Sequence, residues 1–393
     1  MSRTVVVLPG DGIGRVVIPE AVRVLEAAGF TAHTVEAEIG WSCWRRDGEP
    51  LPGRTIALLE QHRLGLLGAV TSKSRAEAEA GLPEPLRGTG HTYRSPILAL
   101  RQRFGLDVCV RPCASFPGNP VNFVRRLASG AIEEPALDLT VFRQNTEDVY
   151  AGVEWIDPPP AVRAALALHP RFSPFLSTPG ADLAVAARIV TRDASRRIVE
   201  AAFRYAAARG KTSVVLAEKP SVLRETSGLV EEAAREVAER HPGIELRSMN
   251  VDAVVFELVR RPERLGVIVA TNLFGDILSD AVAGLTGGLG FAASANLGPK
   301  IALFEPTHGS APSHDGIDPP IANPAGAMLA AALLAEHAGE PLPAERIRAA
   351  IARVVAEGRV RTYDMLRLPA TRDAIAQGAA STREMADAIL ARL

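Results

Sequence analysis

Short apolar runs alternate with segments of helical spacing along this chain, and this alternation restricts the possible folds more than any other feature. Residues 5–8 are apolar and mostly β-branched, residues 9–14 are typical of a turn, and the apolar positions of residues 16–28 follow a helical period. The same succession predicts a helix over residues 181–209, a strand over 212–217, a helix over 231–240, a strand over 264–270 and a helix after Asn272. Strands separated by helices are typical of an α/β fold with a mostly parallel sheet.

Two segments interrupt this alternation. Residues 72–93 are rich in Gly, Pro, Ala and charged residues and lack a stable apolar face, and residues 157–179 contain consecutive prolines at 158–160. Because proline lacks a backbone N–H and disfavours helix interiors, we expect both segments to be loops or excursions outside the regular core.

Composition excludes several classes of protein. The chain has 393 residues, roughly two to three domain lengths, and its 44 Lys and Arg against 45 Asp and Glu leave a formal net charge of −1. This balance disfavours a general binder of nucleic acid or anionic membranes, which would carry an excess of positive charge. The longest apolar run, residues 325–335, is far shorter than the roughly 20 residues that span a bilayer.

The N-terminus and the cysteines both favour a cytoplasmic location. Residues 1–8 lead directly into turn residues, without the long apolar region of a signal peptide. Three cysteines, Cys43, Cys109 and Cys113, are too few and too scattered for a disulfide framework or a zinc site. We therefore expect a reduced, cytoplasmic protein with no nucleic-acid or membrane partner.

The turn at residues 9–14 (PGDGIG) is similar to the glycine-rich loop of dinucleotide-binding folds. It lies between a predicted strand and a predicted helix, and Glu36 or Glu38 could bind a ribose. However, its third glycine comes one position early, and Arg15 stands where the motif requires Gly or Ala. The mismatch favours a structural turn and argues against an ordinary Rossmann reductase, which would hold its nucleotide near Gly12.

The segment from Thr271 to Asp280 (TNLFGDILSD) carries the strongest local signal, at the end of a predicted strand. Asp276 and Asp280 are four residues apart, so both carboxylates project from one face of the predicted helix. Two such oxygen ligands at the carboxyl end of a strand suit Mg²⁺ or Mn²⁺. A helix start enriched in Asp for capping and dipole reasons explains the pattern equally well.

Arginine and lysine usage supplies a second set of candidates. Arg101, Arg111 and Arg143 lie at or beside predicted strand and helix ends, where guanidinium groups could bind carboxylates. In an arginine-rich chain, a surface role is the alternative for each of them. Only four of the 44 basic residues are lysines, at positions 73, 211, 219 and 300. Because lysine can lose its proton when buried, each is a candidate for chemistry, with an ordinary surface position as the alternative.

Five motifs together resemble the β-decarboxylating dehydrogenases, the family of isocitrate, homoisocitrate, 3-isopropylmalate and tartrate/malate-type enzymes. They are PGDGIG, LALRQRFGLDVCVRP, FRQNTEDVYAG, TNLFGDILSDAVAGLTGGLGFAASANLG and ALFEPTHGSAP. The resemblance extends over nearly the whole chain, with the motifs in one order. The resemblance implies oxidation of a 2-hydroxy acid that carries a 3-carboxylate, which leaves as CO₂. It also implies NAD or NADP and a divalent cation, Mg²⁺ or Mn²⁺.

The resemblance assigns roles to individual residues. Arg101, Arg111 and Arg143 match the arginines that hold the substrate carboxylates. Tyr150 matches the tyrosine that protonates the substrate carbon after decarboxylation, and Lys219 matches the lysine that takes the hydroxyl proton. The metal carboxylates would be Asp252, Asp276 and Asp280. In the family the lysine and the first of these aspartates come from the neighbouring subunit, so we expect a homodimer with shared active sites.

The resemblance also places the nucleotide against the loop after residue 307. The residues concerned are His308, Gly309, Ser310, Ala311, Pro312, Ser313, His314 and Asn323. NAD-dependent relatives usually carry Asp after this proline, where it binds the ribose hydroxyls and repels a 2′-phosphate. Here Ser313 and His314 replace that Asp and the aliphatic residue after it, and the loop over residues 313–322 is longer than usual.

Three further positions favour NADP, with NAD as the alternative. Tyr363 and Arg367 resemble the Tyr and Arg that hold the 2′-phosphate in bacterial NADP-dependent isocitrate dehydrogenases. Arg261 matches an arginine that reaches this phosphate from the partner subunit. The missing aspartate and these three potential donors together favour NADP.

The residues after Tyr93 bear on the substrate. Isocitrate enzymes carry Ser and Asn, two positions apart, to bind the γ-carboxylate, whereas this chain has Ser95 and Ile97. Ile97 can neither donate nor accept a hydrogen bond, which disfavours isocitrate. The run from Tyr93 to Ile97 resembles homoisocitrate dehydrogenases, and isopropylmalate enzymes carry an aliphatic residue at this position. The resemblance therefore favours a homoisocitrate- or isopropylmalate-like acid, with isocitrate as the alternative. The preceding segment, residues 74–92, is longer than expected and lines the side-chain pocket in relatives. A non-catalytic regulatory subunit is less favoured, because the tyrosine, the lysine and the three aspartates are all present.

The resemblance implies two domains. We expect a large α/β domain built from residues 1–107 and 287–393, and a smaller middle domain, residues 108–286, that carries the dimer contacts. The catalytic cleft would lie between them, and residues 157–179 would form an arm or clasp between subunits.

Overall fold

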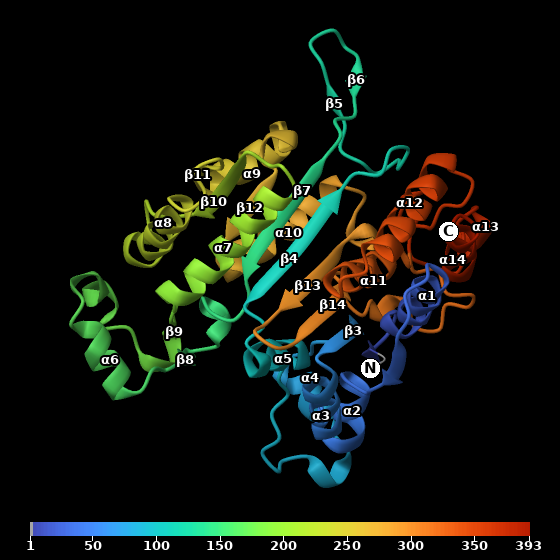
Figure 1. The fold of residues 1–393 in the computed structure, drawn as a ribbon. Helices are drawn as coiled ribbons and strands as arrows, with labels where there is room; N and C mark the ends of the chain where they lie inside the picture. The colour runs from blue at the N-terminus through green and yellow to red at the C-terminus, as the bar shows by residue number, and fades with distance from the viewer. Residues whose placement is uncertain (1–2) are drawn as a thin grey trace.

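The computed structural model describes residues 3–393. They form one sheet of ten strands with helices on both of its faces, and two short two-stranded sheets project from this body (Figure 1). The strands are β1 (Thr4–Gly10), β2 (His33–Glu36), β3 (Leu64–Ala69), β4 (Val108–Ala114), β5 (Arg125–Arg126), β6 (Ile132–Glu133), β7 (Asp138–Gln144), β8 (Glu154–Ile156), β9 (Ala184–Ala186), β10 (Ser213–Glu218), β11 (Glu245–Asn250), β12 (Val267–Ala270), β13 (Ala293–Leu297) and β14 (Ala302–Pro306). The helices are α1 (Gly14–Ala27), α2 (Trp41–Asp47), α3 (Gly53–His62), α4 (Arg75–Gly81), α5 (Pro96–Phe104), α6 (Pro160–Ala167), α7 (Arg192–Ala208), α8 (Arg224–Ala238), α9 (Val251–Arg260), α10 (Asn272–Leu285), α11 (Ala325–His337), α12 (Pro341–Glu357), α13 (Asp373–Ala376) and α14 (Thr382–Leu390).

The large sheet has the strand order β11-β10-β12-β7-β4-β13-β14-β3-β1-β2. Within residues 3–393, six of its nine pairings are parallel, and the three antiparallel ones all involve β4 or β13. The expected α/β fold with mostly parallel pairing is therefore confirmed. The proposed domain boundary would fall between β4 and β13, with five strands on each side. That division stays a prediction, because the sheet is continuous across it.

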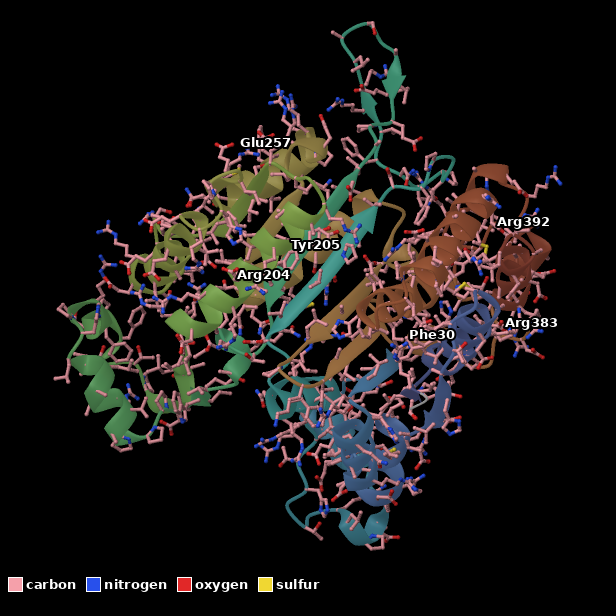
Figure 2. The ribbon with its side chains drawn as sticks, viewed as in Figure 1. Phe30, Arg204, Tyr205, Glu257, Arg383 and Arg392 are labelled. Atoms are coloured by element: carbon pink, nitrogen blue, oxygen red, sulfur yellow. The ribbon has the colours of Figure 1, made fainter. Side chains whose placement is uncertain are left out.

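The two ends of the chain pack together in one apolar core. Side chains of α1, including Val17, Ile18 and Val24, are fully buried in the same cluster as those of α11, α12 and α14. Phe30 lies on the same side of the molecule as Arg383 and Arg392 (Figure 2). The apolar run at residues 325–335, which is α11, is therefore a buried core helix.

The middle of the chain forms the other half of the sheet and covers both of its faces. Helices α9 and α10 bury Val254, Leu258, Leu278 and Val282 against one face, and α7 and α8 cover the opposite face. The outer sides of α9 and α10 carry apolar side chains that are exposed in the single chain. These are Val255 (39%), Phe256 (62%), Val259 (64%), Leu273 (37%) and Ile277 (56%).

One helix is shorter than its composition predicts. The segment 181–209 is helical only from Arg192, where the Thr191 side chain accepts a hydrogen bond from the Ala194 N–H and caps α7. The earlier part contains β9, which pairs with β8 in an antiparallel ribbon. The Ala- and Arg-rich composition indicates a helix throughout, but a distant strand pairing overrides it.

The two expected excursions differ from each other. Residues 72–93 contain the short helix α4, which begins with a capping box between Ser74 and Glu77. This helix buries Ala78 beside Trp44. The prediction that the segment lacks an apolar face was therefore wrong. Residues 157–179 include α6, none of whose side chains is buried. This segment therefore lies outside the core, as expected, and projects from the body (Figure 1). Across residues 3–393, the helices are too short or too polar to span a lipid bilayer.

Candidate active site

Helix α10 places two carboxylates beside the carboxyl end of β12. The helix begins at Asn272, and Asp276 and Asp280 lie one turn apart, with side chains that are 34% and 57% exposed. No acidic residue occupies the first turn of α10, so capping does not explain these aspartates. Gly275 allows the helix to approach β7, because a Cβ there would lie 2.8 Å from the Arg143 Cβ.

Asp276 joins an arginine and a tyrosine. Arg143, 2% exposed at the end of β7, donates to Asp276 through Nη1 and to the Asn272 Oδ1 at 2.8 Å through Nε. The Tyr150 hydroxyl donates to the other oxygen of Asp276. The Arg143 guanidinium carbon also lies 4.9 Å from the centroid of the Tyr150 ring. The tyrosine is thus held between a cation and a carboxylate.

Two more arginines face the same region. Arg111 donates to the Ser279 Oγ at 2.6 Å and to the Asp280 Oδ1 at 3.1 Å, and Arg101 donates to the Glu305 Oε1 at 3.2 Å. Both arginines are only 6% exposed, so a surface role is wrong for them, as it is for Arg143. The Nε atoms of Arg101 and Arg111 are buried without a hydrogen-bond partner. Because buried donors normally find a partner, these atoms are suited to an anionic ligand.

The electrostatics of this cluster follow from burial. Burial lowers the pKa of Arg143, and the nearby Arg101 guanidinium lowers it further. Burial also raises the pKa of Tyr150, and its hydrogen bond to Asp276 adds to this effect. The phenol is therefore protonated near neutral pH and can deliver a proton.

Ser95 and Ile97 lie at the start of α5. The Ser95 hydroxyl does not cap this helix, so it is available to a ligand. Ile97 is half-buried and packs against the apolar cluster that includes Leu8 and Leu100. Ser95 directly precedes the helix that carries Ile97 and Arg101.

Lys219 and Asp252 form a second cluster. Lys219 follows β10, Asp252 lies in the first turn of α9, and their side chains form an ion pair with 28% and 67% exposure. The Lys219 hydrogen bond lowers the pKa of Asp252. Among residues 3–393, no hydrogen bond or ion pair joins Lys219 or Asp252 to Tyr150 or Asp276. The sequence-derived site residues therefore fall into two groups on one chain.

The donor set fits a divalent cation only in part. Asp276 and Asp280 supply the hard oxygen ligands that Mg²⁺ and Mn²⁺ prefer. Within residues 3–393 of one chain, no three His, Cys, Asp or Glu side chains are grouped closely enough to hold a metal ion. The side chain of Asp252, which is 67% exposed, lies outside this group.

The loop after Thr307 packs against the turn at residues 9–14. The Ile13 N–H donates to the Ser310 carbonyl at 3.0 Å, and a Cβ on Gly12 would lie 2.0 Å from the same oxygen, so only glycine fits. Gly12, Ile13 and Val16 line one cavity of about 140 Å³ together with residues 314–317 and 320–322. Gly12 and the loop after Thr307 are therefore neighbours, and the position of the nucleotide stays a prediction.

Unpaired polar atoms in this loop are consistent with a nucleotide site. The Thr307 Oγ1, His308 Nε2 and His314 Nδ1 atoms are buried without a hydrogen-bond partner. Burial lowers the pKa of both histidines, so their imidazoles are neutral at pH 7 and able to accept hydrogen bonds. The Tyr363 ring packs edge-on against His314, with 5.3 Å between the centroids.

The remaining cofactor candidates are dispersed. Asn323 donates to the Asp364 Oδ2 at 3.0 Å and accepts a hydrogen bond from the Ala325 N–H at 3.0 Å. Arg367 is exposed and reaches the Pro120 carbonyl at 3.5 Å. Arg261 is the residue after α9, and among residues 3–393 no hydrogen bond or ion pair joins its side chain to Tyr363 or Arg367.

Residues 4–389 match the isocitrate/isopropylmalate dehydrogenase family. The chain belongs to this family. It is 38% identical over 365 residues to the isocitrate/homoisocitrate dehydrogenase of Thermus thermophilus, which covers 93% of this chain and 94% of the relative. It is 36% identical over 388 residues to Protein DlpA of Legionella pneumophila. This match covers 98% of the present chain but only 58% of the length of DlpA. The crystal structure of isocitrate dehydrogenase from Methylococcus capsulatus matches with a TM-score of 0.81 and 35% identity, covering 99% of each chain.

Membership of the isocitrate/isopropylmalate dehydrogenase family confirms the resemblance seen in the motifs. The chain is an NAD(P)-dependent dehydrogenase that decarboxylates a 2-hydroxy acid with the help of a divalent metal ion. Three polar residues of the site were missed from the sequence. Asn272 and Ser279, both on α10, accept hydrogen bonds from Arg143 and Arg111, respectively. Glu305, on β14, accepts one from Arg101. All three lie inside the quoted motifs, so their position beside the aspartates was the available signal.

Proposed function

We propose that this protein oxidatively decarboxylates a 3-substituted malate, with a homoisocitrate- or isopropylmalate-like acid favoured over isocitrate. One observation carries the proposal: Arg101, Arg111 and Arg143 are buried around Tyr150 and the α10 carboxylates, and two of these arginines keep an unpaired buried Nε. A substrate with two or more carboxylates would satisfy these donors, because guanidinium groups bind carboxylates in bidentate fashion.

Tyr150 and Lys219 would divide the proton transfers between them. Lys219 takes the proton of the substrate hydroxyl while the C2 hydrogen leaves as hydride. The bond between C3 and its carboxylate then breaks and CO₂ departs, and the Tyr150 hydroxyl delivers a proton to C3. When bound, NAD(P)⁺ supplies the hydride acceptor, and a divalent cation supplies positive charge beside the hydroxyl and carboxylate oxygens.

We propose a homodimer with shared active sites as the active unit. Lys219 and Asp252 lie beside the apolar outer surface of α9, where Phe256 and Val259 are more than 60% exposed in the single chain. Such a surface is typical of a protein interface. A second copy of the chain would cover this surface and bring Asp252 to the Asp276 and Asp280 of its partner, which completes three carboxylates.

NADP is the proposed cofactor, with Mg²⁺ or Mn²⁺ as the cation. Ser313 leaves the nucleotide loop without an acidic side chain at the position after Pro312, and the ring of the next residue, His314, packs edge-on against Tyr363. We also propose a cytoplasmic location, because the three cysteines are free and buried, as is typical of proteins in a reducing compartment.

A substrate panel tests the proposal. Turnover of isocitrate, homoisocitrate, 3-isopropylmalate and D-malate is measured with NADP and NAD, each with Mg²⁺ and Mn²⁺. We expect the highest kcat/KM for a 3-substituted malate other than isocitrate, because Ile97 offers no hydrogen bond to a γ-carboxylate. A preference for isocitrate contradicts the substrate assignment, and no turnover of any of these acids contradicts the function.

A further inference from the structure

Arg188 lies between β9 and α7 and uses all five of its N–H groups. Nε donates to the Asp148 Oδ1 at 2.8 Å, and Nη1 donates to the Thr226 Oγ1 at 2.7 Å and the Ser227 Oγ at 3.2 Å. Nη2 donates to the Glu218 Oε2 at 3.1 Å and the Thr271 Oγ1 at 2.8 Å. Since a guanidinium has five N–H donors, this arginine is fully paired inside the protein. Its side chain is 12% exposed.

The first partner, Asp148, lies two residues before Tyr150 in the chain. Its backbone has φ 70° and ψ −152°, a conformation that residues other than glycine rarely adopt. Three hydrogen bonds hold it there: its N–H donates to the Ile189 carbonyl at 2.7 Å, and its carboxylate accepts from Arg188 and, at 3.0 Å, from the Leu273 N–H. A strained residue persists only where its surroundings fix it, so Arg188 helps to fix the backbone two residues before Tyr150.

The second carboxylate, Glu218, directly precedes Lys219. It is 1% exposed, and it accepts hydrogen bonds from Arg188, from the Ser227 hydroxyl at 2.6 Å and from the Thr271 N–H at 3.2 Å. Thr271 in turn stands immediately before α10, the helix of Asp276 and Asp280. One guanidinium therefore connects the segments that carry the tyrosine, the lysine and the α10 carboxylates.

The network has the character of a positioning device. Two buried carboxylates, Asp148 and Glu218, share one buried guanidinium, so removal of Arg188 would leave both without their charged partner. Lysine has three N–H donors and no planar fork, so it cannot make the five contacts. The Phe274 ring, with its centroid 5.4 Å from the guanidinium carbon, closes the remaining side.

We propose that Arg188 is a positioning residue that keeps the segments of Tyr150 and Lys219 in fixed relation. The proposal rests on the proposed function. In a dimer with shared sites, Tyr150 and Lys219 of one chain serve different active sites, so Arg188 connects the two sites of the dimer through one side chain.

Two variants and a matched control test this role in the full-length protein. Arg188→Lys keeps the charge, Arg188→Gln removes it, and Arg23→Gln breaks a comparable pairing with two carboxylates, Glu20 and Asp387, at the chain ends. We expect kcat to fall about tenfold in Arg188→Lys and about a hundredfold in Arg188→Gln, since small displacements of reacting groups have effects of this size. KM should change less than about threefold, because the arginines around Asp276 are untouched.

Hydrogen exchange gives a second readout that needs no substrate. The amides of Asp148 and Leu273 should exchange faster in Arg188→Gln than in the wild type, while those of α1 stay unchanged. The proposal is overturned if kcat is unchanged, if KM rises instead, if Arg23→Gln loses kcat to the same extent, or if these two amides keep their protection. If the wild-type enzyme turns over none of the 3-substituted malates, the proposed function is wrong. Hydrogen exchange then tests by itself whether Arg188 holds the segments of Asp148 and Leu273 in place.

Discussion

The Tyr150 hydroxyl donates a hydrogen bond to Asp276, a carboxylate 126 residues further along the chain. Together with burial, this bond raises the pKa of Tyr150 and keeps its proton in place. The tyrosine and a proposed metal ligand are thus in direct contact, so occupation of Asp276 by a cation would free the phenol to face the substrate.

Tyr150→Phe should lower kcat by about 10²–10⁴, because it removes a general acid and leaves the arginines in place. KM should change little. Steady-state kinetics check this, with Tyr205→Phe as the control, since Tyr205 lies on α7 and its hydroxyl accepts from the Thr140 Oγ1 at 3.1 Å (Figure 2). Equal losses in both variants would show that the effect is structural.

Mixing two inactive variants should restore activity if active sites are shared. In a mixed dimer of Tyr150→Phe and Lys219→Met chains, one site carries both substitutions and the other carries neither. Random mixing makes roughly half of the dimers mixed, so about a quarter of wild-type activity should return. Activity is measured after unfolding and refolding the two proteins together, with each variant refolded alone as the control. Failure to recover activity, with dimers formed, would contradict shared sites.

Arg101→Lys should raise KM about tenfold to a hundredfold, since lysine cannot form a bidentate pair with a carboxylate. Arg103→Lys is the matched control on the same helix, where Arg103 pairs with the exposed Glu60. Substrate titrations of both variants, with thermal unfolding as a check on folding, give the comparison. Equal KM values in the two variants would show that Arg101 does not bind the substrate.

Arg367→Ala should reduce kcat/KM with NADP at least about tenfold and leave that with NAD nearly unchanged, because a paired phosphate contact is lost. The control is Arg359→Ala, an exposed arginine on a neighbouring segment. The two cofactors are compared at saturating substrate. If wild-type enzyme prefers NAD, the cofactor assignment is wrong.

The stability of the protein should fall in acid partly through Glu200. Although partial burial acts in the opposite direction, hydrogen bonds from Arg240, Arg204 and His241 lower its pKa from 4.5 to about 2. A lowered pKa in the folded state stabilises the protein above the ordinary pKa, and this contribution is lost as pH falls towards about 2.

Glu200→Gln should therefore unfold more easily than wild type at about pH 6, and the difference should shrink between about pH 5 and about pH 3. Urea unfolding at several pH values measures it, and the exposed Glu49→Gln is the control. A difference that stays constant with pH would exclude the ion pairs as its cause.

The parts of the fold with a clear local period could be predicted from the sequence. The strand of residues 5–8 and the helix after Asn272 are present where the pattern places them. Residues 184–186 could not be identified as a strand, because their pairing with residues 154–156 is distant in sequence and their composition favours a helix. Tertiary pairing decides the structure of such a segment.

For the candidate site, the motifs supplied the residue types and the structure supplied their grouping. Arg143 was a surface candidate by composition, and the close packing of α10 against β7 at Gly275 buries it. The contact of Gly12 and Ile13 with Ser310 joins two loops that lie far apart in the sequence, which no local pattern indicates. Arg188 lies in none of the five motifs, and its proposed role depends on five hydrogen-bond acceptors that lie 30 to 83 residues away in the sequence.

The packing of α1 against α11, α12 and α14 has a consequence for synthesis on the ribosome. Helix α1 is synthesised long before α11, α12 and α14, whose side chains cover Val17, Ile18 and Val24. While the intervening segments are translated, the nascent chain therefore carries an uncovered apolar stripe, and chaperones that cover this stripe during the interval would lower the risk of aggregation.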